Sequence, residues 1–266
     1  IDQLDAEIVR LLNERIEVVQ QIGNEKKESG GEIYVPSRER AVFDKISELN
    51  KGPLPAESGH AIYREIMSAA LALETEMKIA YLGPEATFTH QAARSKFGAS
   101  VEYLPAATIS EVFDRVQNRS ADYGVVPIEN STEGAVTHTF DQFATTPLKI
   151  CAEIYLPVSL ALLSRHAREE VKVIYSKQEV FGQCRSWLQA HLPQVELSPV
   201  ESTTKAVQLA LESEGAAAIA SVMASDMYNI EVLAENIQDM QGNTTRFLVI
   251  GQQYSASTGD DKTSIV

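Results

Sequence analysis

The spacing of apolar residues changes at about residue 77, and this change restricts the chain to two kinds of structure. Before it, apolar residues recur every three or four positions without a convincing strand, which is typical of amphipathic helices. After it, short apolar runs alternate with helical patterns, which indicates parallel sheets. We therefore expect an all-α part over residues 1–76, followed by an α/β part over residues 77–254.

Three helices are expected in the first part, and charged residues fall on their apolar faces. The first helix has a stripe formed by Ile1, Leu4, Ile8, Leu11, Val18 and Ile22. Arg15 and Lys26 lie on the same stripe, and Arg38 borders the stripe of a second helix that opens at Pro36. The third helix can turn Glu74 toward the same interior. A charged residue on an apolar stripe must be paired, bind a charged ligand or reach water.

Two interpretations of these charged residues are open. In the first, the segment is a helical dimerisation arm in which the Arg and Lys side chains make interhelical ion pairs with Glu39 and Glu74. In the second, the three cations and two carboxylates form a buried site for an anion. Because three helices make a thin core, we expect the segment to pair with a copy of itself.

The helical part resembles the all-helical chorismate mutase domain. The matching pattern runs from Ile1-Asp2-x-Leu4-Asp5 through Leu11-Leu12-Asn13-Glu14-Arg15, Ile22-Gly23-x-x-Lys26 and Pro36-Ser37-Arg38-Glu39. The resemblance implies an intertwined homodimer in which Arg15, Lys26 and Arg38 bind two substrate carboxylates and an ether oxygen. Glu39 would hydrogen-bond a hydroxyl group, and Glu74 stands where the family has a Gln or Glu that donates to the ether oxygen.

Two positions depart from that family, and one residue suggests a pH dependence. The family has another arginine just before the position of Ile1, and Ala70 stands where some members carry a serine. An ionised Glu74 would repel the ether oxygen, so we expect a mutase activity that is favoured at acidic pH. A unimolecular rearrangement needs preorganised cations around a folded dianion, and neither a nucleophile nor a metal.

In the α/β part, residues 124–136 combine a predicted strand, a polar stretch and the start of a predicted helix. Val125 and Val126 predict a buried strand, which Pro127 should end because proline cannot donate to a ladder. Four polar residues follow, and a helix is expected to begin at about Gly134. A strand, a polar turn and a helix N-terminus form a common anion site in α/β proteins, although an ordinary capped loop fits equally well.

Further polar groups stand at residues 83–89, 176–178, 201–204 and 242–247. The strands and helices of this part form two alternating sets, which suggest two lobes with a cleft between them. Any single group is more readily explained by capping than by catalysis. The sequence contains no G-x-G-x-x-G, P-loop or H-E-x-x-H motif, which weighs against a nicotinamide dehydrogenase, a kinase and a zinc hydrolase. We expect no cofactor and no metal.

These loops resemble those of prephenate dehydratase over residues 78–251. The similarity rests on Tyr81-Leu82-Gly83-Pro84-Glu85-Ala86-Thr87-Phe88-Thr89-His90, on residues 124–136, on Glu153-Ile154-x-Leu156-Pro157-Val158 and on Asn243-x-Thr245-Arg246-Phe247. Ala86 stands where glycine is common. The resemblance implies the two-lobed fold of type 2 periplasmic binding proteins, with the substrate between the lobes.

The same resemblance implies roles for individual residues. Thr245 would donate a proton to the departing ring hydroxyl, and Arg246 would support the substrate carboxylates. Glu129 would act as an orienting or hydrogen-bonding group, together with Asn130. The other substrate-binding residues would be Thr87, Ser131, Ser176, Gln183, Glu201 and Phe247. Threonine is a weak acid, and the sequence does not identify the neighbours that would stabilise its alkoxide.

Composition limits the partners and the location. The net charge of −14 argues against nucleic acids and anionic membranes, which are themselves polyanions. Cys151 and Cys184 are too few for a disulfide framework, and no apolar run is long enough for a membrane span, so we expect a cytoplasmic protein.

Residues 255–266 are expected to be a linker whose end resembles the first strand of an ACT regulatory domain; the alternative is a disordered tail.

The two resemblances together imply a bifunctional enzyme of phenylalanine biosynthesis. It would rearrange chorismate to prephenate, and would then dehydrate and decarboxylate prephenate to phenylpyruvate. One alternative is a dehydratase with an inactive or weak mutase part. The other is a two-lobed small-anion binding module that carries a helical dimerisation arm.

Overall fold

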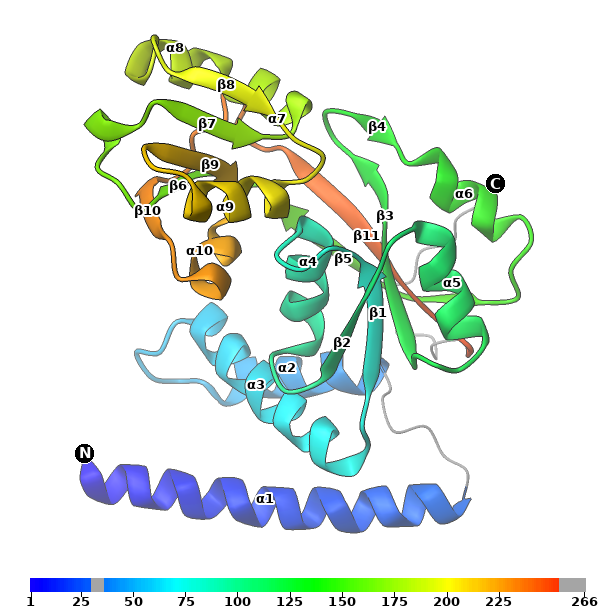
Figure 1. Ribbon diagram of the computed structural model, residues 1–266. Helices are drawn as coiled ribbons and strands as arrows, with labels where there is room; N and C mark the ends of the chain where they lie inside the picture. Colours follow the sequence, from blue (N-terminus) through cyan, green and yellow to red (C-terminus); the bar gives the residue numbers. More distant parts are fainter. Residues whose placement is uncertain (30–35, 254–266) are drawn as a thin grey trace.

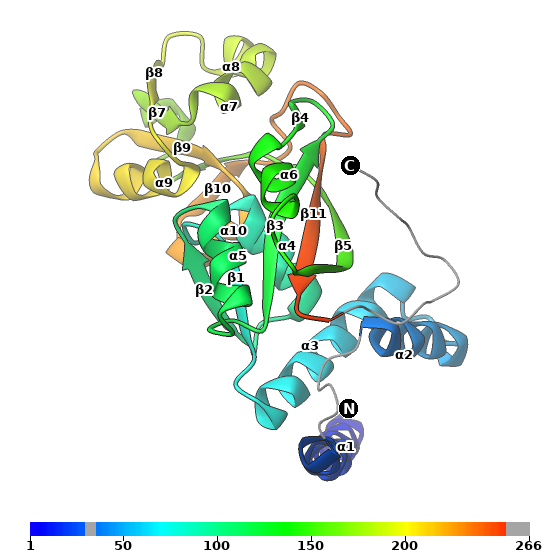
Figure 2. The ribbon, with the colours of Figure 1, turned by 90° about the vertical axis from the view of Figure 1, so that its right-hand side faces the viewer.

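The computed structural model describes residues 1–29 and 36–253, and for residues 26–29, 36 and 37 it describes only the backbone. Three helices come first: α1 (Asp2–Ser29), α2 (Pro36–Leu49) and α3 (Ala56–Glu74). α2 and α3 lie between α1 and the rest of the molecule (Figures 1 and 2). The expected all-α part is therefore confirmed, and its third helix ends at Glu74.

The first lobe of the α/β part is built on a six-stranded sheet with the path β2-β1-β3-β11-β5, and a short β4 pairs with β3. The first three strands of this path are parallel, and β11 is antiparallel to both of its neighbours. The strands are β1 (Lys78–Leu82), β2 (Glu102–Ala106), β3 (Tyr123–Asn130), β4 (Gly134–Ala135), β5 (Lys149–Pro157) and β11 (Thr244–Gly251).

The second lobe contains a five-stranded sheet in the order β10-β6-β9-β7-β8. Its strands are β6 (Ala161–Ser164), β7 (Val173–Ser176), β8 (Glu196–Pro199), β9 (Ala216–Ala220) and β10 (Glu231–Ala234). Its helices are η1 (Arg168–Glu170), α7 (Gln178–Gln183), α8 (Arg185–His191), α9 (Thr203–Glu212) and α10 (Val222–Tyr228). The chain enters this lobe after β5 and leaves it into β11, so the whole second lobe is inserted before the last strand of the first. The two-lobed α/β part is confirmed.

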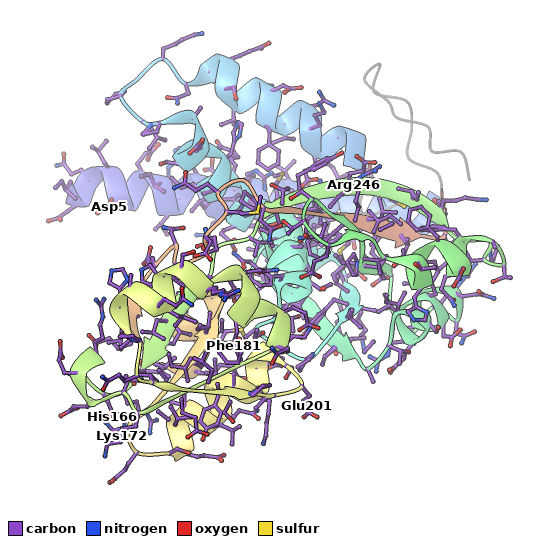
Figure 3. All side chains as sticks on the ribbon, turned by 90° about the horizontal axis from the view of Figure 1, so that it is seen from above. Asp5, His166, Lys172, Phe181, Glu201 and Arg246 are labelled. Carbon is purple, nitrogen blue, oxygen red and sulfur yellow. The ribbon has the colours of Figure 1, made fainter. Side chains whose placement is uncertain are left out.

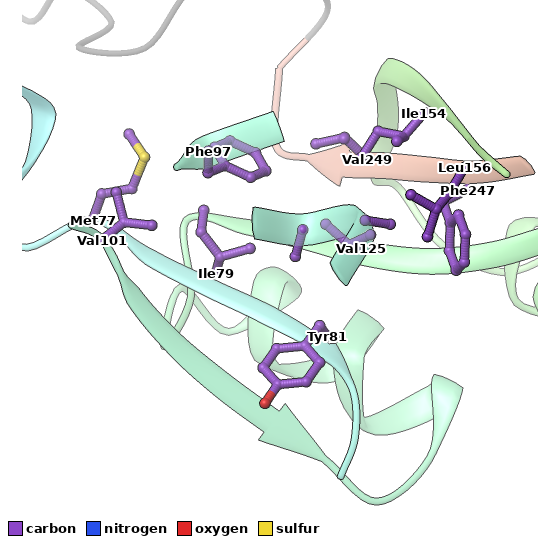
Figure 4. Packing of buried hydrophobic residues seen from close by; sticks show 12 residues of the cluster. Met77, Ile79, Tyr81, Phe97, Val101, Val125, Ile154, Leu156, Phe247 and Val249 are labelled. Atoms are coloured by element: carbon purple, nitrogen blue, oxygen red, sulfur yellow. The ribbon is translucent and has the colours of Figure 1, made fainter. Parts of the chain in front are cut away.

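Helices cover both faces of the first sheet and give each face its own core. α4 (Phe88–Phe97) packs on one face, where Val125, Phe247 and Val249 are buried (Figure 4). α5 (Ile109–Gln117) and α6 (Thr137–Phe143) pack on the other face, against residues such as Leu248. Side chains of successive strand residues point to opposite faces, so the two cores fix the orientation of β11.

Two local predictions in residues 124–136 were wrong. β3 continues through Pro127, because β1 pairs with β3 only as far as Val125 and no strand on that side requires the missing N–H. Gly134 does not begin a helix. It pairs with Asn130 as part of β4, and α6 begins at Thr137. The turn of residues 131–133 is therefore a tight hairpin and not a helix N-terminus.

The loop between β1 and α4 belongs to the first lobe and contacts the second. Ala86 is buried in the core of the second lobe, and its backbone oxygen accepts a hydrogen bond from the Ser221 hydroxyl at 3.2 Å. Ala86 has a φ of 61°, which is a conformation that favours glycine, the residue that the resemblance leads us to expect here. The Ala86 N–H donates to Nδ1 of the buried His90 at 3.2 Å.

Among the described residues, no helix has both the length and the apolar character that crossing a membrane requires. The predicted linker and ACT-like strand at residues 255–266 lie outside the described residues.

Candidate functional site

A cavity of about 160 Å³ in the helical part collects most of the predicted mutase residues. Arg15 of α1, Arg38 and Glu39 of α2, and Glu74 of α3 all line it. Nη1 of Arg15 is buried and has no hydrogen-bond partner among the described residues. Such a buried guanidinium nitrogen requires an anion or another acceptor. Lys26 lies in α1, but its side chain is outside the described part.

The packing of α1 against α3 explains a glycine in the mutase-like pattern. A Cβ on Gly23 would lie 3.1 Å from Cγ and from Oε2 of Glu74. Because glycine has no Cβ, the α1 backbone can approach this side chain closely. Gly23 therefore fixes where the Glu74 carboxylate can lie in the cavity.

Two cations of this cavity were missed by the sequence reasoning. Arg64 of α3 lines the cavity, and so does Lys96, which belongs to α4 of the first lobe. Nζ of Lys96 forms an ion pair with the buried Glu39 carboxylate. The spacing of residues 1–76 could not reveal Lys96, because its proximity depends on how the two parts of the chain pack.

The second group of polar residues lies where β3 and β11 end. The Asn130 amide oxygen accepts hydrogen bonds from the backbone N–H groups of Thr132, at 2.9 Å, and Glu133, at 3.0 Å. These two donors orient the amide, so its Nδ2 donates to the Thr245 hydroxyl oxygen and to Oδ1 of Asn243, both at 2.8 Å. Asn130 is thus the neighbour of Thr245 that the sequence did not identify, and Asn243 completes the cluster.

A shift in strand register brings Asn130 and Thr245 together. Arg246 pairs with Glu129 while the next residue, Phe247, pairs with Pro127, so Ile128 has no partner in β11. In a regular strand, Glu129 would face the α4 side and Asn130 the opposite side. The extra residue reverses this order, so that Asn130 shares a face with Thr245.

Arg246 lies on the other face of β11, away from the Thr245 hydroxyl. Its Nη2 is paired with Glu153 of β5, and its Nη1 lies 3.9 Å from Oε2 of Glu129. The hydrogen bond to Glu153 raises the pKa of Arg246 further above its ordinary value. The side chains of Arg246 and Thr245 therefore lie on opposite faces of β11, because adjacent residues of a strand alternate in direction. Glu129 lies beside Arg246 on that face and not beside Asn130, with which the resemblance had grouped it.

A cavity of about 500 Å³ lies between the two lobes beside this cluster. It is lined by Thr132 and Glu133 from the first lobe, by Gln183 from the second, and by Asn243 from the connection between them. Nε2 of Gln183 donates to Oε1 of Glu133 at 2.9 Å, which is a direct contact across the cavity. Gln183 thus faces the first lobe as predicted, and Glu133 is a lining residue that the prediction missed.

Other predicted residues have structural partners. Thr87 caps α4, and its hydroxyl donates to the Pro84 oxygen at 3.0 Å. Ser176 is buried and donates to the Ile219 oxygen at 2.7 Å, and Ser131 accepts from the Thr244 N–H at 3.0 Å. Phe247 belongs to the core beneath the cluster. Glu201 is exposed on the second lobe, whereas Arg246 lies in the first (Figure 3).

The described residues contain no group of three or more His, Cys, Asp or Glu side chains that could hold a metal ion. Burial raises the pKa of the Cys184 thiol to about 12, so this cysteine is not a thiolate nucleophile at neutral pH.

Comparison with known proteins assigns both parts of the chain. The chorismate mutase type II family matches residues 1–75, and the prephenate dehydratase family matches residues 79–255. The chain is 50% identical over 271 residues to the bifunctional chorismate mutase/prephenate dehydratase of Aquifex aeolicus, with 100% of this chain and 75% of that protein covered. It is 44% identical over 269 residues to the enzyme of the same name from Neisseria gonorrhoeae, with 100% and 74% covered.

Among solved structures, a prephenate dehydratase from Arthrobacter aurescens in complex with L-Phe is similar to the α/β part. Its TM-score is 0.62 at 33% identity, and the similarity covers 66% of this chain and 61% of that one.

Proposed function

Because the chain belongs to the bifunctional chorismate mutase/prephenate dehydratase family, we propose that it catalyses two consecutive reactions of phenylalanine biosynthesis. The helical part rearranges chorismate to prephenate, and the α/β part converts prephenate to phenylpyruvate. The match of both families to one chain carries this proposal, since the product of the first reaction is the substrate of the second. We place the boundary between the two parts at residues 76 and 77.

In the helical cavity, fixed cations hold the substrate dianion in its reactive shape. Arg15 and Arg38 bind the carboxylates, together with Lys26, and the unpartnered Nη1 of Arg15 supports this role. Glu39 accepts a hydrogen bond from the substrate hydroxyl. Glu74, when protonated, donates to the ether oxygen as negative charge develops there. Groups that are already oriented toward the developing charge lower the barrier without reorganisation.

In the α/β part, Thr245 donates the proton to the departing hydroxyl group. Its oxygen already accepts a hydrogen bond from the Asn130 amide, so its own proton is directed elsewhere. As that proton leaves, the same amide stabilises the alkoxide. Loss of carbon dioxide and formation of the aromatic ring then drive the reaction, and the enzyme needs only to assist the leaving group and hold the substrate.

The two lobes enclose this substrate. Gln183 and Glu133 line the cavity from opposite lobes and hydrogen-bond to each other across it. Arg246 contributes from the opposite face of β11, where its ion pairs with Glu153 and Glu129 hold the strand that carries Thr245.

We also propose that the protein is a homodimer formed through α1. The apolar stripe of this helix is exposed in the single chain, at Ile1, Leu4, Ile8, Leu11, Val18 and Ile22. An apolar face of this length needs a covering surface. Sedimentation should give twice the chain mass of 29.2 kDa. Both cysteines are free thiols, which suits the reducing cytoplasm where we place the protein.

The proposed function is tested by supplying the two substrates separately to the full chain. We expect phenylpyruvate, which is detected by its absorbance in alkali, to form from chorismate as well as from prephenate. Conversion of prephenate alone would indicate an inactive mutase part. Conversion of neither substrate, with binding retained, would favour the small-anion binding module.

A further inference from the structure

The end of α4 and the loop that follows it are docked on α3. Nη1 of Arg64 donates to the Ser95 oxygen at 3.2 Å, and the Ala99 N–H donates to Oε2 of Glu65 at 2.9 Å. The Ser100 N–H donates to the buried Ser68 hydroxyl at 3.0 Å. Two of these bonds engage backbone N–H groups of the loop, so the α/β part is held against the helical part without help from Lys96.

Lys96 extends from this docked segment into the helical cavity. Its side chain is 22% exposed, and the Glu39 side chain with which it pairs is 9% exposed. Phe97 lines the same cavity. The cavity that we assign to chorismate is therefore closed partly by residues outside the helical part.

The charges that line the cavity change when Lys96 is counted. The described lining residues are four cations, Arg15, Arg38, Arg64 and Lys96, and two carboxylates, Glu39 and Glu74. Lys96 thus adds one positive charge to a cavity that we assign to a dianion, and its ion pair offsets the Glu39 carboxylate, which would otherwise repel that dianion. In a partly buried site, a missing charge is poorly replaced by solvent.

We propose that Lys96 of the α/β part is a positioning residue of the mutase site. It holds the Glu39 carboxylate where that group accepts a hydrogen bond from the substrate hydroxyl, and it offsets the charge of that carboxylate beside the dianionic substrate. This inference rests on the proposed mutase activity. It makes the first reaction dependent on a residue that belongs to the part that carries out the second.

The test uses the full chain with K96M, which keeps an unbranched side chain one atom shorter than that of lysine and removes its charge. We expect the KM for chorismate to rise about tenfold and kcat to fall about threefold, because Glu39 loses its ion pair with Lys96 and the cavity loses one positive charge. K96R should restore kcat/KM to within about threefold of the original. Turnover of supplied prephenate should stay within twofold in both variants.

Two further variants separate positioning from folding. K172M removes an exposed lysine of the second lobe and should leave the kinetics of both reactions unchanged. K96M combined with E39Q should lose less than the product of the two single losses, because Lys96 acts through Glu39. Unchanged mutase kinetics in K96M, equal loss of both activities, additive losses in the double variant, or an arginine as harmful as methionine would each overturn the proposal. If the original chain does not convert chorismate, the proposed function itself fails instead.

Discussion

In the helical part, the polar groups of the site are the ends of long side chains that come from three helices and from α4. In the α/β part, they are the short side chains of Asn130, Asn243 and Thr245, held by neighbouring strands. A short side chain has few rotatable bonds and stays where its strand places it, whereas the end of a long cationic side chain depends on the groups that surround it. The geometry of the α/β site thus depends on strand register, and the geometry of the helical site depends on how the helices and α4 pack together.

The two parts also differ in how much of their apolar surface and of their site a single part of the chain supplies. Both lobes have buried cores, and β11 lies between two partner strands. By contrast, α1 leaves its apolar stripe exposed, and the helical cavity takes Lys96 from the first lobe. This contrast suggests that changes far along the chain will affect the mutase site more than changes in the helices will affect the dehydratase site.

The largest expected effect is that of T245A, which would separate the two sites. Removal of the hydroxyl should lower dehydratase kcat by at least about 100-fold, which is the usual contribution of a positioned acid. Mutase turnover should stay within about threefold, so that prephenate accumulates from chorismate. T245S keeps the hydroxyl and should retain activity within about tenfold. Equal loss of both activities in T245A would show that the sites are not independent.

A smaller effect is expected from G23A, which tests whether packing sets the mutase site. The new methyl group would press on Glu74 and displace its carboxylate by a few tenths of an ångström. We expect mutase kcat to fall about fivefold while dehydratase kcat is unchanged. The gain in helix propensity, about 1 kcal/mol, offsets the steric cost, so the free energy of unfolding should change little. G52A is the matched control, because a Cβ there meets nothing within 4 Å. Full mutase activity in G23A would contradict this account.

The smallest expected effect at neutral pH is that of His90 on the free energy of unfolding. Burial, with a lesser effect of Arg94, lowers the pKa of His90 from 6.5 to about 4, and its Nδ1 accepts the Ala86 N–H. The folded protein binds this proton less readily than the unfolded chain does. The stabilisation is therefore complete above pH 6.5 and is lost as the pH falls toward 4, by about 2–3 kcal/mol.

Urea unfolding of the α/β part, measured at several pH values between 7 and 4, checks this prediction. H90Q has no titrating ring, so its unfolding free energy should depend less on pH over this range. An identical pH dependence in the two proteins would remove His90 as the cause.

Much of the fold could be predicted from the sequence, because apolar spacing reports which face of an element is buried. The cations Arg15 and Arg38 were found in this way, since charge on an apolar stripe is a visible exception. Lys96 could not be found, because its partner Glu39 is 57 positions away and their approach depends on tertiary packing. The separation of Arg246 from Thr245 follows from strand alternation, but the position of Asn130 depends on the extra residue Ile128, which no local pattern revealed.

The place of β11 in the first sheet has a consequence for how the protein is synthesised. β11 lies between β3 and β5, yet the ribosome makes it after the entire second lobe. Until then, β3 and β5 of the nascent chain each lack a neighbour, and unpaired strand edges invite pairing with other chains. The second lobe can fold first, but the first lobe must wait for the strand that carries Thr245. The residue proposed for catalysis therefore arrives with the segment that completes the fold.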